Sequence, residues 1–341
     1  MRRRGLTVLV GAVLVVGLTL LMGHARVPYV ELEPGPTYDT LGLDDKGKDV
    51  ITISGAPVSS SKGQLRFVTI GARQDLTLIE ALRGWWRDDD AVVPRELLIP
   101  PNLTDQQVEQ RNAEDFAQSG SAAEAAALTK LGYPARVSVK EVASGLPADG
   151  KLRAGDVIKT IDGTAVDSAT KLLQLIRARS VGATLTVGYE RGGQPATVSI
   201  TTVAGDDGTP RIGIVPQVDQ PHPFTLDIPV DNVGGPSAGL MLALGILDKL
   251  QPEDLTGGKI IAGTGTIDEA GRVGPIGGVP QKIVAAKRDG ATIFLTPTDN
   301  CAEAVANAVP GLILVRVTSL DDALAALQAV RAGQQPRLCS A

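Results

Sequence analysis

The sequence predicts an α+β protein with an N-terminal membrane helix and more than one folded domain. The chain has 341 residues, and a domain commonly has roughly 100–200. Alternating apolar residues at 50–53 and 65–70 indicate strands, and the patterns at 76–86 and 103–132 indicate helices. A second group of strands surrounds one predicted helix between residues 135 and 202. These observations predict several domains that mix helices and strands.

The N-terminal segment indicates a helix that targets the protein to a membrane. Residues 6–22 carry no charge and follow Arg2, Arg3 and Arg4. Roughly 17–20 apolar residues cross a hydrocarbon core of about 30 Å, and the arginines should stay in the cytoplasm. The alternative is a cleaved signal peptide, because residues 23–25 offer a small-x-small cleavage pattern. The first reading gives a single-pass membrane protein with its body outside the cytoplasm, and the second gives a secreted protein.

The composition excludes several classes of function. The net charge of -5 lacks the basic surface expected of a nucleic-acid binder. Two histidines and two cysteines cannot form a zinc cluster; they are His24, His222, Cys301 and Cys339. The chain also lacks the Gly-x-x-x-x-Gly-Lys-Ser/Thr loop that binds nucleotide phosphates. We therefore expect no nucleic-acid partner, no metal and no cofactor.

The two cysteines predict a disulfide if the body faces an oxidising compartment. A bridge between Cys301 and Cys339 would hold the polar C-terminal tail against the rest of the protein. Such bridges typically add about 2–4 kcal/mol by restricting the unfolded chain. The alternative is two unrelated free thiols.

Residues 135–202 have the sequence pattern of a separate peptide-binding module. The string GLPADGKLRAGDVIKTIDG lies between a strand and a helix, and it resembles the PDZ domains attached to bacterial envelope proteases. PDZ domains bind an extended peptide as an added strand at a sheet edge. The resemblance implies that the strand 136–142 is that edge, with Val137, Val139 and Val142 as candidate peptide contacts. The alternative is a spacer domain without a ligand.

The sharpest motif surrounds one serine. Ser237 follows a predicted strand at 224–230 and precedes an apolar helical run at 240–250. Unpaired N–H groups and the dipole at a helix N-terminus can stabilise an oxyanion, and small neighbours let a substrate backbone approach. These neighbours are Gly235, Pro236, Ala238 and Gly239. The alternative is a glycine-rich turn with a serine N-cap.

The pattern Gly-x-Ser-x-Gly also occurs at the nucleophile of α/β-hydrolases, whose histidine follows the serine in the chain. Both histidines of this chain precede Ser237, so a triad of that order cannot form. A pair of Ser237 with His222 stays open, but a base other than histidine is better supported.

A second motif supplies that base. Residues 264–267 and 271–278 are glycine-rich and precede Lys282. Together with the Gly-Pro-Ser-Ala-Gly string they resemble the proteolytic domain of the Lon family, in the form that carries a PDZ module and no ATPase. The resemblance implies that Ser237 is the nucleophile, Lys282 the general base, and Thr264 the hydroxyl beside the lysine.

The chemistry of lysine agrees with this assignment. An ordinary lysine, with a pKa near 10.4, is protonated at neutral pH, and burial in apolar surroundings lowers that pKa. The side chains of Val279, Ile283 and Val284 would provide such surroundings, and no acidic residue is adjacent in sequence. The alternative is a solvated helix lysine, as expected for Lys287.

The chain departs from the Lon pattern in two respects. Residues 263–266 read Gly-Thr-Gly-Thr, where Lon enzymes usually have Met-Thr-Gly-Glu, and the ATPase module is missing. The string at 51–71 weakly resembles the first hairpin of the Lon domain, which would make the PDZ module an insertion.

The patterns described above divide the chain into five parts. They are a membrane segment, a mixed region, a PDZ-like domain, a Lon-type domain and a tail, at 1–26, 27–128, 129–204, 205–333 and 334–341.

The sequence thus predicts an ATP-independent serine endopeptidase that cleaves unfolded or flexible proteins outside the cytoplasm. Its partners would be protein or peptide substrates and the membrane, and by analogy with Lon it would form a homo-oligomer. The main rival is a PDZ adaptor or chaperone whose Lon-like domain binds peptides without cutting them. An intramembrane or signal peptidase is a third reading, but the candidate residues lie far along the chain from the N-terminal helix.

Overall fold

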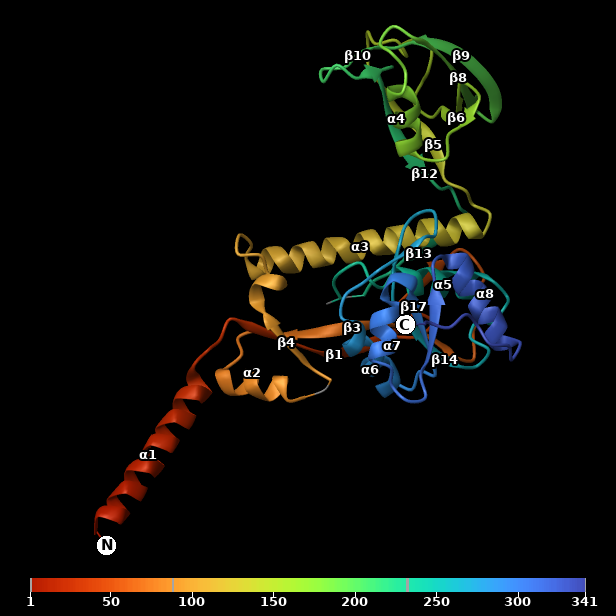
Figure 1. Ribbon diagram of the computed structural model, residues 1–341. Coiled ribbons are helices and arrows are strands. Elements are labelled where there is room, and N and C mark those ends of the chain that lie inside the picture. Colours follow the sequence, from red (N-terminus) through yellow and green to blue (C-terminus); the bar gives the residue numbers. More distant parts are fainter. Residues whose placement is uncertain (1, 88, 231–232, 341) are drawn as a thin grey trace. The chain divides into compact units, whose positions relative to one another are not determined.

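The computed structural model describes residues 2–87, 89–230 and 233–340. The chain forms two compact units (Figure 1). The larger unit consists of residues 1–127 and 224–341, and the smaller unit consists of residues 128–223. In chain order, the smaller unit is therefore inserted between the two parts of the larger one.

The N-terminal segment forms the helix α1 (Arg2–His24). Its apolar side chains from Leu9 to Leu21 are exposed to solvent. The side chains of residues 1–5, 7 and 8, including the three predicted cytoplasmic arginines, lie outside the part that the structure describes. Within the described part, no helix has both the length and the apolar character needed to cross a membrane.

The larger unit is built on a mixed six-stranded sheet with the order β18-β17-β14-β3-β1-β4. Four neighbouring strands, from β18 to β3, run parallel, and β1 and β4 join antiparallel at one side. Strands from both parts of the unit therefore share one sheet. The strands are β1 (Tyr29–Asp39), β3 (Gln64–Arg73), β4 (Ala91–Pro94), β14 (Ile260–Gly263), β17 (Ile293–Pro297) and β18 (Ile313–Val317).

Helices cover both faces of this sheet. Every residue of β17, the second strand from one edge, is buried, as expected for a parallel strand with helices on either side. The helices α5 and α8 pack on each other, and so do α6 and α7 (Figure 1). They are α5 (Gly239–Leu250), α6 (Val279–Arg288), α7 (Cys301–Ala306) and α8 (Leu320–Arg331).

Two further helices precede the smaller unit. The helix α2 (Leu78–Trp85) begins with a capping box, in which the Thr77 hydroxyl accepts from the Glu80 N–H and the Glu80 carboxylate accepts from the Thr77 N–H. The helix α3 (Asp105–Lys130) has 26 residues. The remaining short elements are β2 (Thr52–Ser54), η1 (Arg95–Leu97), β13 (Thr225–Asp227), β15 (Thr266–Ile267), β16 (Val273–Gly274) and η2 (Thr298–Asn300).

The smaller unit is a sheet of order β12-β5-β6-β8-β9, with β7 paired to β6 and one helix, α4. Its buried core contains Leu172 and Ile176 of α4 among the strand residues. The elements are β5 (Arg136–Val142), β6 (Val157–Ile161), β7 (Thr164–Ala165), α4 (Ala169–Arg177), β8 (Thr184–Arg191), β9 (Gln194–Thr201), β10 (Val203–Ala204), β11 (Pro210–Arg211) and β12 (Ile214–Asp219).

The strand β12 corrects two expectations about this unit. Because β12 pairs antiparallel with β5, the compact unit extends to residue 223 and does not end at 204. The same pairing places β5 between β12 and β6, so β5 is not the sheet edge. The side chains of Val137 and Val139 are buried in the core, and Val142 packs against that core. These three residues therefore support the fold and do not face an open edge.

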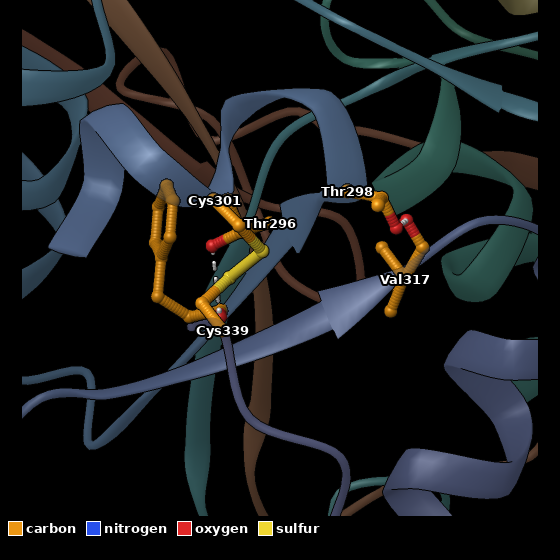
Figure 2. The surroundings of a disulfide bond; sticks show 6 residues. Thr296, Thr298, Cys301, Val317 and Cys339 are labelled. Carbon is orange, nitrogen blue, oxygen red and sulfur yellow. Dashed lines mark hydrogen bonds between the residues drawn. A yellow bond between two sulfur atoms is a disulfide. The ribbon is translucent and has the colours of Figure 1, made fainter. Parts of the chain in front are cut away.

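A disulfide joins Cys301 and Cys339, the pair that the sequence analysis expected (Figure 2). Cys301 is the first residue of α7. The C-terminal segment runs beside β18, where the Cys339 N–H donates to the Leu314 carbonyl and the Arg316 N–H donates to the Arg337 carbonyl. The tail is thus fixed to the edge of the large sheet by both backbone hydrogen bonds and the bridge.

Candidate active site

Ser237 lies in the loop that leads into α5. The helix itself starts at Gly239, two residues later, and its residues from Gly239 to Lys249 are all buried. The apolar run after the serine therefore forms a core helix, which fixes the position of the loop. The Ser237 side chain remains half-buried at the surface of a cavity.

Lys282 lies in the first half of α6, and its side chain points to the serine. The Lys282 Nζ atom lies 2.9 Å from Ser237 Oγ and 3.3 Å from Thr264 Oγ1. Lys282 is only 3% exposed. The lysine is thus enclosed, with two hydroxyl groups as hydrogen-bond partners.

Burial lowers the pKa of Lys282 from 10.5 to about 8. The cause is desolvation, which disfavours the charged ammonium form. A lysine with this pKa supplies an appreciable fraction of neutral amine near neutral pH. It can therefore accept a proton from a neighbouring hydroxyl, which an ordinary solvated lysine cannot do efficiently.

Thr264 fixes both the lysine and the backbone of the serine. Its side chain is fully buried, and its hydroxyl donates to the Ser237 carbonyl at 3.1 Å. The Gly265 N–H donates to the same carbonyl at 2.9 Å, and the Leu240 N–H donates to the Gly265 carbonyl. The segment that follows β14 therefore holds the serine loop from one side.

Two cavities meet at Ser237 and Lys282. The larger has a volume of about 730 Å³ and the smaller about 330 Å³. The larger cavity has mainly apolar walls, which include Val30, Leu32, Ile70, Ile99, Val108 and Ile276. The smaller includes Tyr38, Phe67 and Val68. Apolar surface thus lies beside the Ser237 hydroxyl.

The structure brings together most of the residues predicted for the site. Thr264 contacts both Ser237 and Lys282, and the small neighbours of the serine share its loop. Gly235 and Pro236 line the larger cavity, Ala238 lines the smaller one, and Gly239 begins α5. The other candidate base, His222, belongs to the smaller unit, where its Nδ1 lies 2.7 Å from the Gln220 carbonyl.

Two contacts on α3 were not predicted. The Asn112 carbonyl accepts from the Gly235 N–H, and the Ser119 hydroxyl donates to the Pro236 carbonyl. The sequence signal for them was the apolar face of the helix, since Phe116, Ala123 and Ala127 are buried at helical spacing on either side of Ser119.

The smaller unit has a cavity beside a strand that the sequence analysis did not name. A cavity of about 430 Å³ lies between α4 and β12, with Leu173, Arg177, Ile214 and Pro216 in its walls. The strand β12 is the free edge of the sheet beside this groove. The string Arg-Ile-Gly-Ile-Val at 211–215 was the signal, because its alternating apolar residues indicate another strand.

No cluster of three or more His, Cys, Asp or Glu side chains with the arrangement of a metal site occurs in residues 2–87, 89–230 and 233–340.

Comparison with known families gives two matches. Residues 106–202 match the PDZ domain model, and residues 225–327 match the model of the Lon protease (S16) C-terminal proteolytic domain. The second match includes both Ser237 and Lys282. The first begins within α3 and ends before β12, so its bounds differ from those of the compact unit.

Parts of the chain are also similar to individual proteins. The chain is 38% identical over 103 residues to Lon protease 2 of Bacillus subtilis, covering 30% of this chain and 17% of that protein. It is 40% identical over 93 residues to the Lon protease of Azospirillum brasilense, covering 26% and 11%. The match thus spans less than a fifth of those relatives. The PDZ domain of the SdrC-like protein from Listeria monocytogenes is 34% identical, with 24% of this chain and 85% of that chain covered and a TM-score of 0.23.

Proposed function

The chain combines a PDZ domain with a Lon-type proteolytic domain, and we propose that it is an ATP-independent serine endopeptidase with a Ser237–Lys282 dyad. The observation that carries this proposal is the 2.9 Å distance between Lys282 Nζ and Ser237 Oγ in a buried site. The lowered pKa of Lys282 supports it, because a neutral amine can act as a general base.

The reaction would proceed through an acyl-enzyme. Neutral Lys282 takes the proton of the Ser237 hydroxyl while Oγ attacks the peptide carbonyl. The lysine then gives this proton to the leaving amine, and the peptide C–N bond breaks. Water attacks the ester with the lysine again acting as the base, which releases the acid product and restores the serine.

The loop geometry supports a site for the developing oxyanion. The first N–H groups of a helix lack intrahelical acceptors, and the helix dipole adds positive potential there. The N–H groups of Gly235 in the loop and of Leu240 in the first turn of α5 are already bonded. The N–H groups of Ser237 and Ala238, which lie between them, are therefore our candidates for the oxyanion donors.

The cavities favour a substrate with an apolar side chain close to the bond that is cut. Such a side chain would be removed from water by the walls of the larger cavity, including Leu32 and Ile70. The chain has no nucleotide-binding motif. The substrates would therefore be proteins that are already unfolded or that expose a flexible segment.

The smaller unit would bind peptides at the groove between α4 and β12. An extended peptide can pair with the free edge of β12 while one of its apolar side chains enters the cavity. The proposed peptide site is thus β12 and its groove, in place of β5. A spacer role without a ligand is the alternative, and it predicts no change in binding when the groove is altered.

The proposal is tested with the purified full-length chain in detergent, an unstructured protein as substrate, and neither ATP nor metal. Wild type should cleave, and Ser237→Ala and Lys282→Ala should each lose at least about 10³-fold in kcat, as for other nucleophile and base variants. Full activity in either variant would rule out the dyad.

A peptide-binding adaptor is the second candidate, and the PDZ groove favours it over other rivals. The adaptor and the protease predict different results for the wild-type chain. Wild type would bind peptides, would leave the substrate intact, and would not react with a fluorophosphonate probe that labels activated serines.

We also propose that the body of the protein lies outside the cytoplasm, attached by α1. This rests on the apolar residues 6–22, the arginines before them and the disulfide, which persists in oxidising compartments. Protease added to intact cells should degrade the body, and alkaline carbonate should leave the chain in the membrane fraction. Protection from the protease would contradict the orientation, and release by carbonate would favour the secreted alternative.

A further inference from the structure

We propose that α3 is a positioning element for the serine loop, and that Ser119 is its main positioning residue. The proposal rests on the proposed function, because it assigns a role in placing the nucleophile. The Ser119 hydroxyl binds the backbone of the loop at Pro236, so Ser119 acts on the nucleophile through that backbone.

Two hydrogen bonds connect α3 to the loop. The Gly235 N–H donates to the Asn112 carbonyl at 2.8 Å, and the Ser119 hydroxyl donates to the Pro236 carbonyl at 2.9 Å. Asn112 and Ser119 are about two helical turns apart in sequence, so they lie on one face of α3. The helix therefore contacts two consecutive residues immediately before the nucleophile.

The helix and the loop also approach each other too closely for side chains. A Cβ atom on Gly234 would lie 2.6 Å from the Asn112 Cβ, and one on Gly239 would lie 2.7 Å from Ser119 Oγ. Both distances are shorter than ordinary contacts between carbon and its neighbours. The glycines on either side of Ser237 are thus needed for the helix to pack directly on the loop.

The opposite side of the loop is fixed by the segment after β14. There, the Gly265 N–H and the Thr264 hydroxyl both bind the Ser237 carbonyl. The serine is consequently held between two supports, and α3 is the one that acts on the residues preceding it. Without that support, Ser237 Oγ would sample positions away from Lys282 Nζ, and a displacement of about 1 Å can reduce turnover by about 10²-fold.

Ser119 and Ser121 form a matched pair for the test. Ser119 is 5% exposed and binds the loop, whereas Ser121 is exposed and binds the Ala117 carbonyl within its own helix. Ser119→Ala therefore removes the loop contact, Ser121→Ala is the control, and Ser119→Thr restores the hydroxyl. All three variants are made in the full-length chain.

The measurements are kcat and KM on a peptide substrate and the rate of labelling by a fluorophosphonate. Ser119→Ala should lower kcat and the labelling rate by about 10–100-fold with KM changed less than about twofold. Ser121→Ala should have the kcat and labelling rate of wild type, and Ser119→Thr should keep most of the wild-type kcat and labelling rate. A role in folding alone would lower the active fraction, which active-site titration corrects for, and would leave kcat per active site unchanged.

Equal kcat and labelling rates for Ser119→Ala and Ser121→Ala would overturn the positioning role while leaving the dyad intact. By contrast, wild type that neither cleaves nor reacts at Ser237 would overturn the proposed function itself. If Ser119→Ala does not fold, Gly234→Ala tests the packing of α3 on the loop at a neighbouring contact, since its methyl group would push the loop from Asn112. It should lower kcat with little effect on KM, and unchanged kcat would again reject the proposal.

Discussion

The side chain of Asn300 binds both backbone polar groups of Ile276. Its Oδ1 accepts from the Ile276 N–H and its Nδ2 donates to the Ile276 carbonyl, both at 2.9 Å. Asn300 is buried beside the disulfide residue Cys301, and Ile276 lines the larger cavity at the dyad. A side chain from the η2 turn thus fixes one wall of the candidate cleft.

Replacing Asn300 should therefore impair both folding and cleavage. In Asn300→Ala the N–H and carbonyl of Ile276 lose their partners, which costs roughly 1–3 kcal/mol per unsatisfied buried group. We expect a lower free energy of unfolding in denaturant titrations and a higher KM, because the cleft wall moves. Asn307→Ala is the control, since its amide donates to a carbonyl one turn away on the protein surface. Equal effects of the two variants would show that the Ile276 contact has no special role.

Cleavage should increase with pH around the pKa of Lys282. Burial lowers this pKa to about 8, so the neutral amine that accepts the serine proton becomes the main form above that value. In the acid range kcat/KM should rise about tenfold per pH unit and level off near pH ~9. The measurement is a pH profile of peptide cleavage, with fluorophosphonate labelling as a second readout. A profile that is flat from about pH 6 to about pH 9 would contradict a lysine base.

The same burial should make Lys282 a source of instability at neutral pH. The unfolded chain has the ordinary pKa of 10.5 and the folded chain one of about 8, so the unfolded state binds more protons between these values. This contribution to the free energy of unfolding therefore rises as pH increases from about 8 to 10.5. At pH 7, Lys282→Met should raise the free energy of unfolding by up to about 3 kcal/mol, at about 1.4 kcal/mol per pKa unit.

Urea titrations of Lys282→Met at pH 7 and pH 10 test this expectation, with the exposed Lys259→Met as the control. The gain should shrink at pH 10, and the control should change stability by less than about 0.5 kcal/mol at either pH. A gain of the same size at both pH values would mean that better packing, and not the removed charge, stabilises the variant.

The sequence was most informative where chemistry is concentrated in short motifs. The small residues around Ser237 indicated a site where a substrate backbone can approach a nucleophile, and the roles of Lys282 and Thr264 were implied by the resemblance to the Lon proteolytic domain. Because both histidines precede Ser237, a histidine base was less well supported than the lysine. The supports of the site could not be assigned in this way. Ser119 and Asn300 are ordinary polar residues in sequence, and their roles depend on which backbone groups the tertiary fold places opposite them.

Strand order was the weakest part of the sequence prediction. The pattern at 136–142 correctly predicted a strand, but a strand's place in a sheet depends on segments that return later in the chain. Here β12, which follows β5 only after four other strands of the same sheet and a helix, covers the edge that β5 was expected to offer. Because β12 belongs to the smaller unit, this unit also ends at residue 223 and not at the predicted residue 204. Local periodicity contains no information about such a long-range pairing.

Loss of the disulfide should destabilise the larger unit while leaving the chemistry intact. The bridge connects residues 38 positions apart and holds the segment that pairs with β18. Cys339→Ser should lower the free energy of unfolding by about 2–4 kcal/mol, and kcat should remain within about twofold of wild type. The double variant Cys301→Ser/Cys339→Ser should show no further loss. Added reductant should destabilise wild type but not the double variant, and a similar loss in both would point to a cause other than this bridge.

The groove of the smaller unit gives the last prediction. Leu173 of α4 is 38% exposed and lines the cavity beside β12, whereas Gln174 is exposed on the same helix and is not among the lining residues. Leu173→Arg places a charge where an apolar peptide side chain would enter, so peptide affinity should fall at least about tenfold, as expected for one lost apolar anchor. Gln174→Arg adds the same charge outside the cavity and should leave affinity unchanged. Fluorescence anisotropy with a library of labelled peptides measures both. If the two variants bind alike while cleavage of unfolded proteins is also unaffected, the unit acts as a spacer and substrate selection resides in the cleft at Ser237.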